Sequence, residues 1–296
     1  FALDLEKAHS AIKEHIADPL GLTVPAAARG IVDIVDAKMA DLIRKMTIER
    51  GHDPREFVLF AYGGSGPTHV GGYGMELEIA EVVIPYYAPV FSAYGIATSD
   101  MTHTAMLSEP SLFPPEEGRM VAIFSDLKRE LMEFFCRYGF ESEQVTLQSL
   151  IDMRFKRQMK EITLAVPTGE DRVDIEGLRE SFVGAYEAKY GQGTALRTAD
   201  IEVVNYRVVG SGHFDSPPLR ELGSRPKDPS RAFKEKRSAF WEGQPVATPS
   251  YEHSRLEPGN VIEGPALIEA EFTTIAVHPG QRVEMDTYAN LRLRRI

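Results

Sequence analysis

The sequence predicts an α/β segment, followed by an α+β unit and a β-rich C-terminal unit. A short apolar run, a glycine-rich loop and a helical pattern follow one another in residues 57–77. Residues 118–209 mix amphipathic helical patterns with extended runs, and residues 233–296 are short extended segments separated by turn residues. These are the patterns of a strand–loop–helix unit, of an α+β unit and of a β-rich unit. We therefore expect four parts, at residues 1–112, 113–210, 211–232 (a linker) and 233–296.

Composition excludes several classes of protein. The 296 residues are 43% hydrophobic and 26% charged, with a formal net charge of −11, which disfavours a nucleic-acid partner. The single cysteine, Cys136, rules out an intrachain disulfide and suits a cytoplasmic protein. No apolar run approaches the ~20 residues of a membrane span. Because the sequence starts at Phe1 rather than Met, we expect that a further segment precedes it.

The clearest predicted helix covers residues 26–50. Thr23 can cap its start, Pro25 suits its first turn and Gly51 can close its end. Its apolar residues recur at helical spacing and form one stripe: Ile31, Val35, Met39, Leu42 and Met46. The acidic residues fall mostly off this stripe and are predicted to face solvent: Asp33, Asp36 and Asp41.

A buried strand is predicted over residues 57–62, because the run is nearly all apolar. The glycine-rich residues 63–69 follow, then a helix from about residue 70 to 77 and a second buried strand at 81–84. This order favours a parallel sheet.

Further along, the patterns predict a small α+β unit. Its helices are expected at 118–139 and around Leu178, Phe182 and Tyr186, and its strands at 145–155, 161–166 and 201–209. In the last part Trp241 is a predicted packing anchor.

The strongest chemical signal is the loop after the first strand. Glycines at 63, 64 and 66 leave the backbone open to an anion, and Ser65 and Thr68 add hydroxyl groups. The following helix presents its positive N-terminal end. We expect Gly63, Gly64, Ser65, Gly66 and Thr68 to contact a phosphate or nucleotide. The alternative is a tight turn without a ligand, and the loop is not a Walker A sequence because no lysine follows its last glycine.

The stretch Tyr62-Gly-Gly-Ser-Gly-Pro-Thr-His69 resembles the glycine motif of the hydantoinase A/oxoprolinase/acetone carboxylase family, usually FGGAGPLH. The resemblance continues in order along nearly the whole chain. It is carried by residues 49–55, by Val90-Phe-Ser-Ala-Tyr-Gly95, by Asp152-Met-Arg-Phe155 with Gln158, by Lys189-Tyr-Gly191, by residues 263–269 and by Pro279-Gly280. Together these motifs are specific, although most are weak singly.

The resemblance implies part of an actin/hexokinase-like ATPase core, in which the glycine motif contacts ATP. In that fold the N-terminal half supplies a second glycine loop and an acidic residue that positions Mg²⁺. No GxDxGGT-like segment is present here. The chain is therefore expected to be a fragment, or one subunit of a larger assembly, that carries half of an ATP site. Its partner would be the rest of the parent polypeptide or another subunit, with the Mg²⁺ ligands mainly outside this chain.

Two further side chains are candidate catalytic residues. His69 ends the glycine motif, where it can touch a phosphate or the substrate, or simply cap the helix. Arg154 has a planar fork suited to an anionic intermediate, and an ion-paired strand surface is the alternative. No spacing typical of a metal site is present.

The family likeness implies an enzyme that uses ATP to activate a carbonyl substrate. The Pro67-Thr68-His69 form and Tyr94 resemble the ketone carboxylase branch, of the acetone or acetophenone type. ATP-dependent hydrolysis of a cyclic amide, such as a hydantoin or 5-oxoproline, is the first alternative. A non-catalytic assembly subunit is the second.

Overall fold

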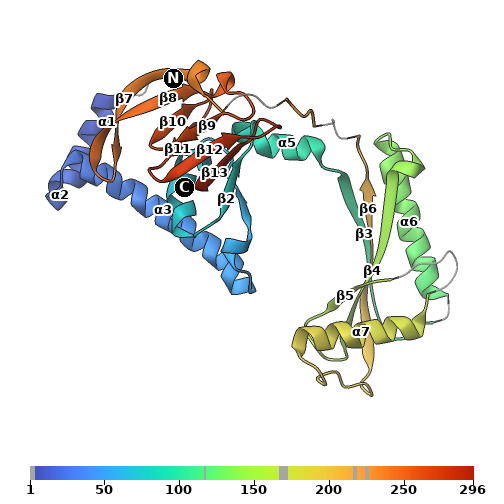
Figure 1. The fold of residues 1–296 in the computed structure, drawn as a ribbon. Helices are drawn as coiled ribbons and strands as arrows, with labels where there is room; N and C mark the ends of the chain where they lie inside the picture. The colour runs from blue at the N-terminus through green and yellow to red at the C-terminus, as the bar shows by residue number, and fades with distance from the viewer. Residues whose placement is uncertain (1–3, 117, 167–172, 216–218, 224–226) are drawn as a thin grey trace. The chain divides into compact units, whose positions relative to one another are not determined.

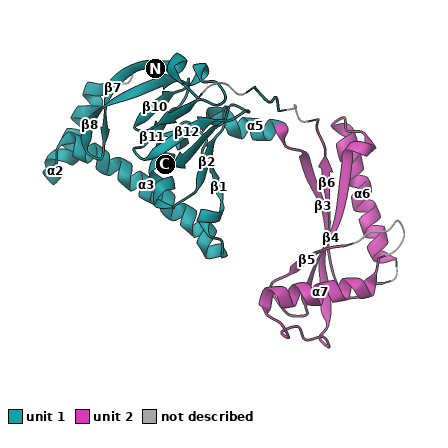
Figure 2. Cartoon of the chain, viewed as in Figure 1, with its two compact units in different colours: residues 1–97, 218–296 teal, residues 98–217 magenta. Residues whose placement is uncertain are grey.

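The chain divides into two compact units in the computed structural model, which describes residues 4–116, 118–166, 173–215, 219–223 and 227–296 (Figure 2). The first unit combines residues 1–97 with 218–296, and the second is residues 98–217. The C-terminal strands share a sheet with β2 (Glu81–Ile84), so residues 233–296 do not form the separate unit expected. The strand that ends at residue 112 pairs within the second unit. The expected linker falls partly on residues 216–218 and 224–226, outside the described residues.

The first unit opens with helices (Figure 1). They are α1 (Leu5–Ile12), α2 (Asp18–Leu20) and the long α3 (Val24–Thr47). The predicted cap is present, because Thr23 Oγ1 accepts the N–H of Ala26 at 3.4 Å. A short 3-10 turn follows α3, and Gly51 ends it at a φ of +82°. Both ends predicted from the sequence are confirmed.

The face of α3 that packs within this chain is not its apolar stripe. Asp36 and Ala40 are buried, on the side where α3 contacts α4 (Gly66–Glu76). The stripe itself is exposed, from 38% at Ile31 to 55% at Met46. The prediction that Asp36 faces solvent is therefore wrong, because helical spacing groups residues on a face without saying which face another element covers.

A five-stranded mixed sheet forms one layer of this unit, in the order β1-β2-β13-β12-β9. Its strands are β1 (Val58–Phe60), β2, β9 (Val261–Glu263), β12 (Gln281–Met285) and β13 (Leu291–Arg295). β1 and β2 are parallel, as expected, and the other pairs are antiparallel. β1 is an edge strand with Val58 and Phe60 half exposed, so the prediction of a buried strand is wrong there.

A second sheet of the first unit has the order β11-β10-β8-β7. Its strands are β7 (Phe233–Trp241), β8 (Gln244–Glu252), β10 (Ala266–Glu269) and β11 (Thr274–Val277). Trp241 is buried at the end of β7 and donates its indole N–H to Thr248 Oγ1 at 2.8 Å. This confirms its predicted role as a packing anchor.

The second unit is an antiparallel sheet with two helices. The strand order is β3-β6-β4-β5. The strands are β3 (Met101–Leu112), β4 (Val145–Phe155), β5 (Ile162–Ala165) and β6 (Ile201–Gly212), and the helices are α6 (Arg119–Arg137) and α7 (Ile175–Tyr190). The predicted α+β elements are all found, with ends within a few residues of those expected.

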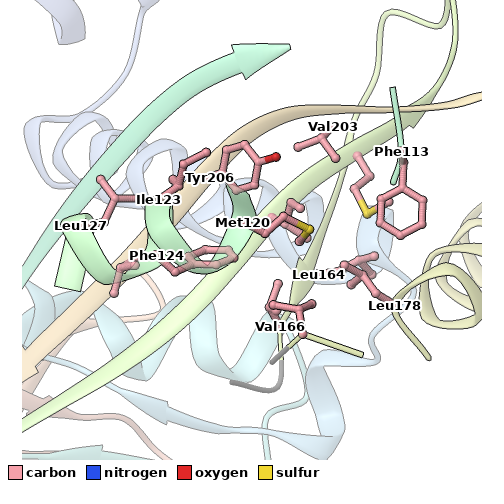
Figure 3. Packing of buried hydrophobic residues seen from close by; sticks show 14 of the residues in the cluster. Phe113, Met120, Ile123, Phe124, Leu127, Leu164, Val166, Leu178, Val203 and Tyr206 are labelled. Atoms are coloured by element: carbon pink, nitrogen blue, oxygen red, sulfur yellow. The ribbon is translucent and has the colours of Figure 1, made fainter. Parts of the chain in front are cut away.

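The core of the second unit lies between the sheet and these helices (Figure 3). Phe124, Leu131 and Phe135 of α6 are at most 1% exposed, as their spacing predicts. Phe124 meets Tyr206 of β6 edge to face, with ring centroids 5.6 Å apart. This packing fixes the sheet whose outer positions carry Arg154.

Candidate functional site

The glycine loop connects the edge strand β1 to the N-terminus of α4. Gly63 adopts a φ of +85° and donates its N–H to Ala88 O at 2.7 Å. Glycine suits this position because other L-residues rarely adopt such a conformation. At the other end of the loop, Ser65 O accepts the N–H groups of Thr68 and His69 and begins the helix.

The loop leaves three consecutive backbone donors open. Within the part of the chain that is described, the N–H groups of Gly64, Ser65 and Gly66 have no hydrogen-bond acceptor. The Ser65 hydroxyl does not cap the helix and is exposed. Adjacent free N–H groups at a helix N-terminus form a binding site for an anion.

The glycines at 64 and 66 are not required by the packing of this chain. A Cβ atom at Gly64 would lie 3.8 Å from Phe272 O, and one at Gly66 would lie 3.9 Å from the carbonyl carbon of Ala61. Both are ordinary contacts. On the same helix, by contrast, a Cβ at Gly71 would come within 2.5 Å of His278. Internal packing therefore does not require glycine at 64 and 66, and the bare backbone at both positions leaves room for a ligand to approach closely.

The turn between β10 and β11 is hydrogen-bonded to the glycine loop and to the first turn of α4. Thr273 Oγ1 donates to Gly64 O at 2.8 Å, and Thr68 Oγ1 donates to Thr274 O at 2.7 Å. The Thr68 hydroxyl therefore links α4 to β11, and its proton is donated to Thr274 O. These contacts join residues about two hundred positions apart, so no local pattern in the sequence predicts them.

His69 is held by a buried carboxylate. Its Nδ1 lies 2.8 Å from Oδ1 of Asp36, whose side chain is 9% exposed, while the His69 side chain is 24% exposed. Burial raises the pKa of Asp36, and the hydrogen bond from His69 offsets this only in part. Burial also raises the pKa of the neighbouring Tyr73 to about 12, with a smaller contribution from the Asp36 charge. Sequence reasoning missed Asp36 as a partner of the glycine motif.

Aromatic side chains lie beside the loop on the first unit. Phe91 of α5 (Phe91–Thr98) stacks on Phe60 with ring centroids 6.3 Å apart and packs at 5.4 Å from Tyr62. Phe60 and Tyr62 are about half exposed. Phe91 and Tyr94 are themselves only partly buried. The cluster is therefore a surface feature next to the glycine loop.

Arg154 lies in the second unit, on β4. Its Nε is 3.1 Å from Glu202 Oε2 and its Nη1 is 3.9 Å from Glu161 Oε1. The ion-paired strand surface, which was the alternative, is thus present. The role in catalysis stays a prediction.

The adjacent Asp152 is buried and accepts hydrogen bonds from Thr163, Asn205 and Arg207. Burial opposes its ionisation, but these donors outweigh burial and lower the pKa of Asp152. The motif around Asp152 therefore has a structural use in tying three strands of the sheet together.

Two negative observations apply to the described residues. They contain no group of three or more His, Cys, Asp or Glu side chains placed to hold a metal ion. None of their helices has the length and hydropathy needed to cross a membrane.

A glycine loop between a strand and a helix N-terminus, in a mixed α/β unit, is typical of proteins that bind phosphorylated ligands. Family comparison is more specific. The hydantoinase/oxoprolinase model matches residues 1–105, and the hydantoinase/oxoprolinase C-terminal domain model matches residues 116–296. The chain belongs to the hydantoinase/oxoprolinase family, and its mixed helix and sheet fold is part of the actin/hexokinase-like fold expected from the resemblance.

Among curated relatives, the acetone carboxylase beta subunit of Xanthobacter autotrophicus is 29% identical, over 99% of this chain and 43% of its own length. The acetophenone carboxylase gamma subunit of Aromatoleum aromaticum is 32% identical, over 97% of this chain and 40% of its own. This chain therefore spans about two fifths of each, and both relatives are named as subunits.

Solved structures agree with this family assignment. A nucleotide-free structure of acetone carboxylase, from work on ATP-dependent acetone carboxylation, matches with a TM-score of 0.87 and 28% identity, over 99% of this chain and 43% of that one. An ATP-dependent caprolactamase from Pseudomonas jessenii matches with a TM-score of 0.73 and 30% identity, over the same shares.

Proposed function

We propose that the glycine loop of this chain forms one half of an ATP site in an enzyme that activates a carbonyl substrate. The observation that carries the proposal is the run of three open N–H donors at Gly64, Ser65 and Gly66, at the N-terminus of α4. The proposed contacts are the backbone of Gly63 to Gly66 with phosphate or ribose. The ATP-dependent relatives support ATP as the ligand.

The chemistry explains why such an enzyme needs ATP. A bicarbonate, amide or enol oxygen is a poor leaving group until it has been phosphorylated. Fixed N–H donors stabilise the negative charge that develops on the phosphoryl oxygens during the transfer, and they need no reorganisation to do so. Mg²⁺ would neutralise part of that charge, with ligands that we place mainly outside this chain.

Ketone carboxylation is the substrate assignment that we favour, because acetone and acetophenone carboxylase subunits are among the relatives. The likeness to a caprolactamase supports the alternative, ATP-dependent opening of a cyclic amide. A non-catalytic assembly subunit is the third possibility. The open glycine loop argues against it, since the packing of the chain itself does not require glycine at 64 and 66.

The site needs a partner, and the surface of the first unit supports one. The α3 stripe and the edge strand β1 expose apolar side chains on the same unit as the loop, including Leu42 at 54% and Phe60 at 51%. Exposed apolar side chains gathered on one face of a helix or along an edge strand are typical of an interaction site. We propose that the remainder of the parent polypeptide, or another subunit, covers this surface and completes the ATP site. Residues 1–296 alone should show no Mg²⁺-dependent ATPase activity.

The first experiment substitutes Gly64 by Ala and by Val in the complete enzyme. The structure leaves room for a Cβ at Gly64, so Gly64→Ala should keep the melting temperature of the parent, and thermal unfolding of Gly64→Val shows whether valine is accommodated as well. A side chain there obstructs an approaching phosphate, so ATP affinity should fall at least about tenfold, or 1.4 kcal/mol. Gly184→Val is the control, at a helical glycine of the second unit where a Cβ meets nothing within 4 Å. Unchanged affinity in folded Gly64→Val would refute the nucleotide contact.

The second experiment decides the substrate. The complete enzyme is incubated with ATP and labelled bicarbonate, first with a panel of ketones and then with hydantoins, lactams and 5-oxoproline. Ketone-dependent incorporation of label is the expected result. ATP-dependent ring opening without incorporation would replace carboxylation by cyclic amide hydrolysis.

A further inference from the structure

Asp36 and His69 form a hydrogen-bonded pair between α3 and the glycine motif. The two side chains come from different helices, and only one ring nitrogen is engaged: Nδ1 lies 2.8 Å from Asp36 Oδ1. In the described part of the chain, Nε2 has no hydrogen-bond partner, and about a quarter of the side chain is exposed. Nδ1 of His69 is therefore engaged by Asp36, and Nε2 is available to bind another group.

The position of His69 on α4 places its side chain near the glycine loop. His69 lies four residues after Ser65 and donates its backbone N–H to Ser65 O. Side chains on a helix lean towards its N-terminus and cover the preceding turn. The turn that precedes His69 contains the open N–H groups of Ser65 and Gly66.

The space for the Asp36 carboxylate depends on a glycine. A Cβ at Gly72 would lie 2.0 Å from Asp36 Oδ2 and 2.9 Å from its carboxyl carbon. Gly72 is three residues after His69, so both lie on the face of α4 that meets α3. A buried carboxylate, a histidine and a glycine that makes room for the carboxylate thus form one arrangement.

We propose that Asp36 is a positioning residue that holds the His69 imidazole with Nε2 turned towards the glycine loop, where Nε2 contacts the anion bound there. An ionised Asp36 accepts the Nδ1 proton and so fixes the tautomer and the orientation of the ring. This inference rests on the proposed function, since it assigns a contact within the same site.

The variants that test it separate the two ring nitrogens. In His69→Asn the amide falls near the position of Nδ1 and can still bond Asp36, but nothing replaces Nε2. In His69→Gln the amide reaches the position of Nε2. If His69 presents Nε2 to a phosphate, the Asn variant should lose at least about tenfold in MgATP affinity or in kcat, and the Gln variant should retain more. If His69 only ties α4 to α3, the Asn variant should behave like the parent and the Gln variant should not.

Two substitutions test the positioning by Asp36. Asp36→Asn removes the charge at nearly constant shape, and Gly72→Ala displaces the carboxylate while keeping its charge. Each substitution made alone should reduce MgATP binding or kcat. In the His69→Asn background each should have a much smaller effect, because Asp36 and Gly72 act on the site only through His69. Matched controls are Asp33→Asn, one turn earlier on α3 and paired with Arg29, and Gly74→Ala, whose Cβ would make an ordinary 3.5 Å contact with Val82.

All variants are made in the complete enzyme and compared by MgATP titration, steady-state kinetics and thermal unfolding. If the losses of MgATP affinity or kcat add to that of His69→Asn, or follow a fall in melting temperature, Asp36 does not position His69, and the proposed nucleotide site is unaffected. If the parent enzyme binds no MgATP, or Gly64→Val binds it as well as the parent does, the proposed function itself falls and the pair with it.

Discussion

His278 should make the stability of the first unit depend on pH between 6.5 and 4. The side chain lies next to Gly71 of α4. Its ring meets that of Trp241 edge to face, with 5.1 Å between the ring centroids. Burial, with a smaller contribution from the charge of Arg29, lowers the pKa of His278 to about 4 from the ordinary 6.5. The unfolded chain therefore binds a proton in this interval that the folded chain does not, and acidification favours unfolding.

The size of the effect follows from the shift. A difference of about 2.5 pKa units, at 1.36 kcal/mol each, corresponds to a loss of about 3 kcal/mol as the pH falls from 6.5 to 4. The contribution is fully present above pH 6.5, and the loss is complete below pH 4. Burial also lowers the pKa of His253, which adds a loss of the same sign that is independent of His278.

The assay compares urea unfolding of the protein and of His278→Gln at intervals between pH 8 and 4.5. Between pH 7 and 8 the two free energies of unfolding should differ by a constant, which measures the packing cost of the substitution. Below pH 6.5 they should converge, because only the parent loses the His278 contribution. Parallel curves down to pH 4.5 would show that the His278 proton is not coupled to folding.

Three further outcomes are expected. Gly71→Ala should lower the free energy of unfolding by about 1–3 kcal/mol, because its Cβ would clash with His278 and with Ala276 O. Gly30→Ala, on α3 where a Cβ meets nothing within 4 Å, should raise the free energy of unfolding by up to about 1 kcal/mol. Urea unfolding measures both changes. Arg154→Lys should lower kcat/KM more than Glu202→Gln does if Arg154 touches the substrate as predicted, and equal losses in kinetic assays would leave only their ion pair. Leu42→Glu, on the exposed stripe, should leave the unit folded by circular dichroism but weaken assembly of the complete enzyme in size-exclusion chromatography, and unchanged assembly would remove α3 from the interface.

Some features of the candidate site could be predicted from the sequence and others could not. The glycine loop is visible in the sequence because an anion-binding backbone needs glycines and a helix N-terminus in consecutive positions. Its support from Thr273 and the pairing of His69 with Asp36 are not visible. Both depend on contacts between elements, and hydroxyl and carboxylate groups occur on many surfaces where they have no such partner.

Local physical chemistry determined most of the elements. Thr23 and Gly51 mark the ends of the α3 segment, because capping and left-handed closure act within one turn. Apolar periodicity located α6, and the extended run at 145–155 matches β4 to the residue. Interactions between residues a few positions apart can be predicted from the sequence, because both partners lie in the same short segment.

The tertiary structure decided which of those elements meet. Leu291 of β13 pairs with Ile84 of β2 across more than two hundred residues, and this pairing, rather than any composition boundary, joins the C-terminal strands to the first unit. It also left β1 at the edge of the sheet and buried Asp36 while the apolar stripe of α3 stayed exposed. Strand order and the covered face of a helix depend on the free energy of packing distant surfaces together, and neither periodicity nor local propensity contains that information.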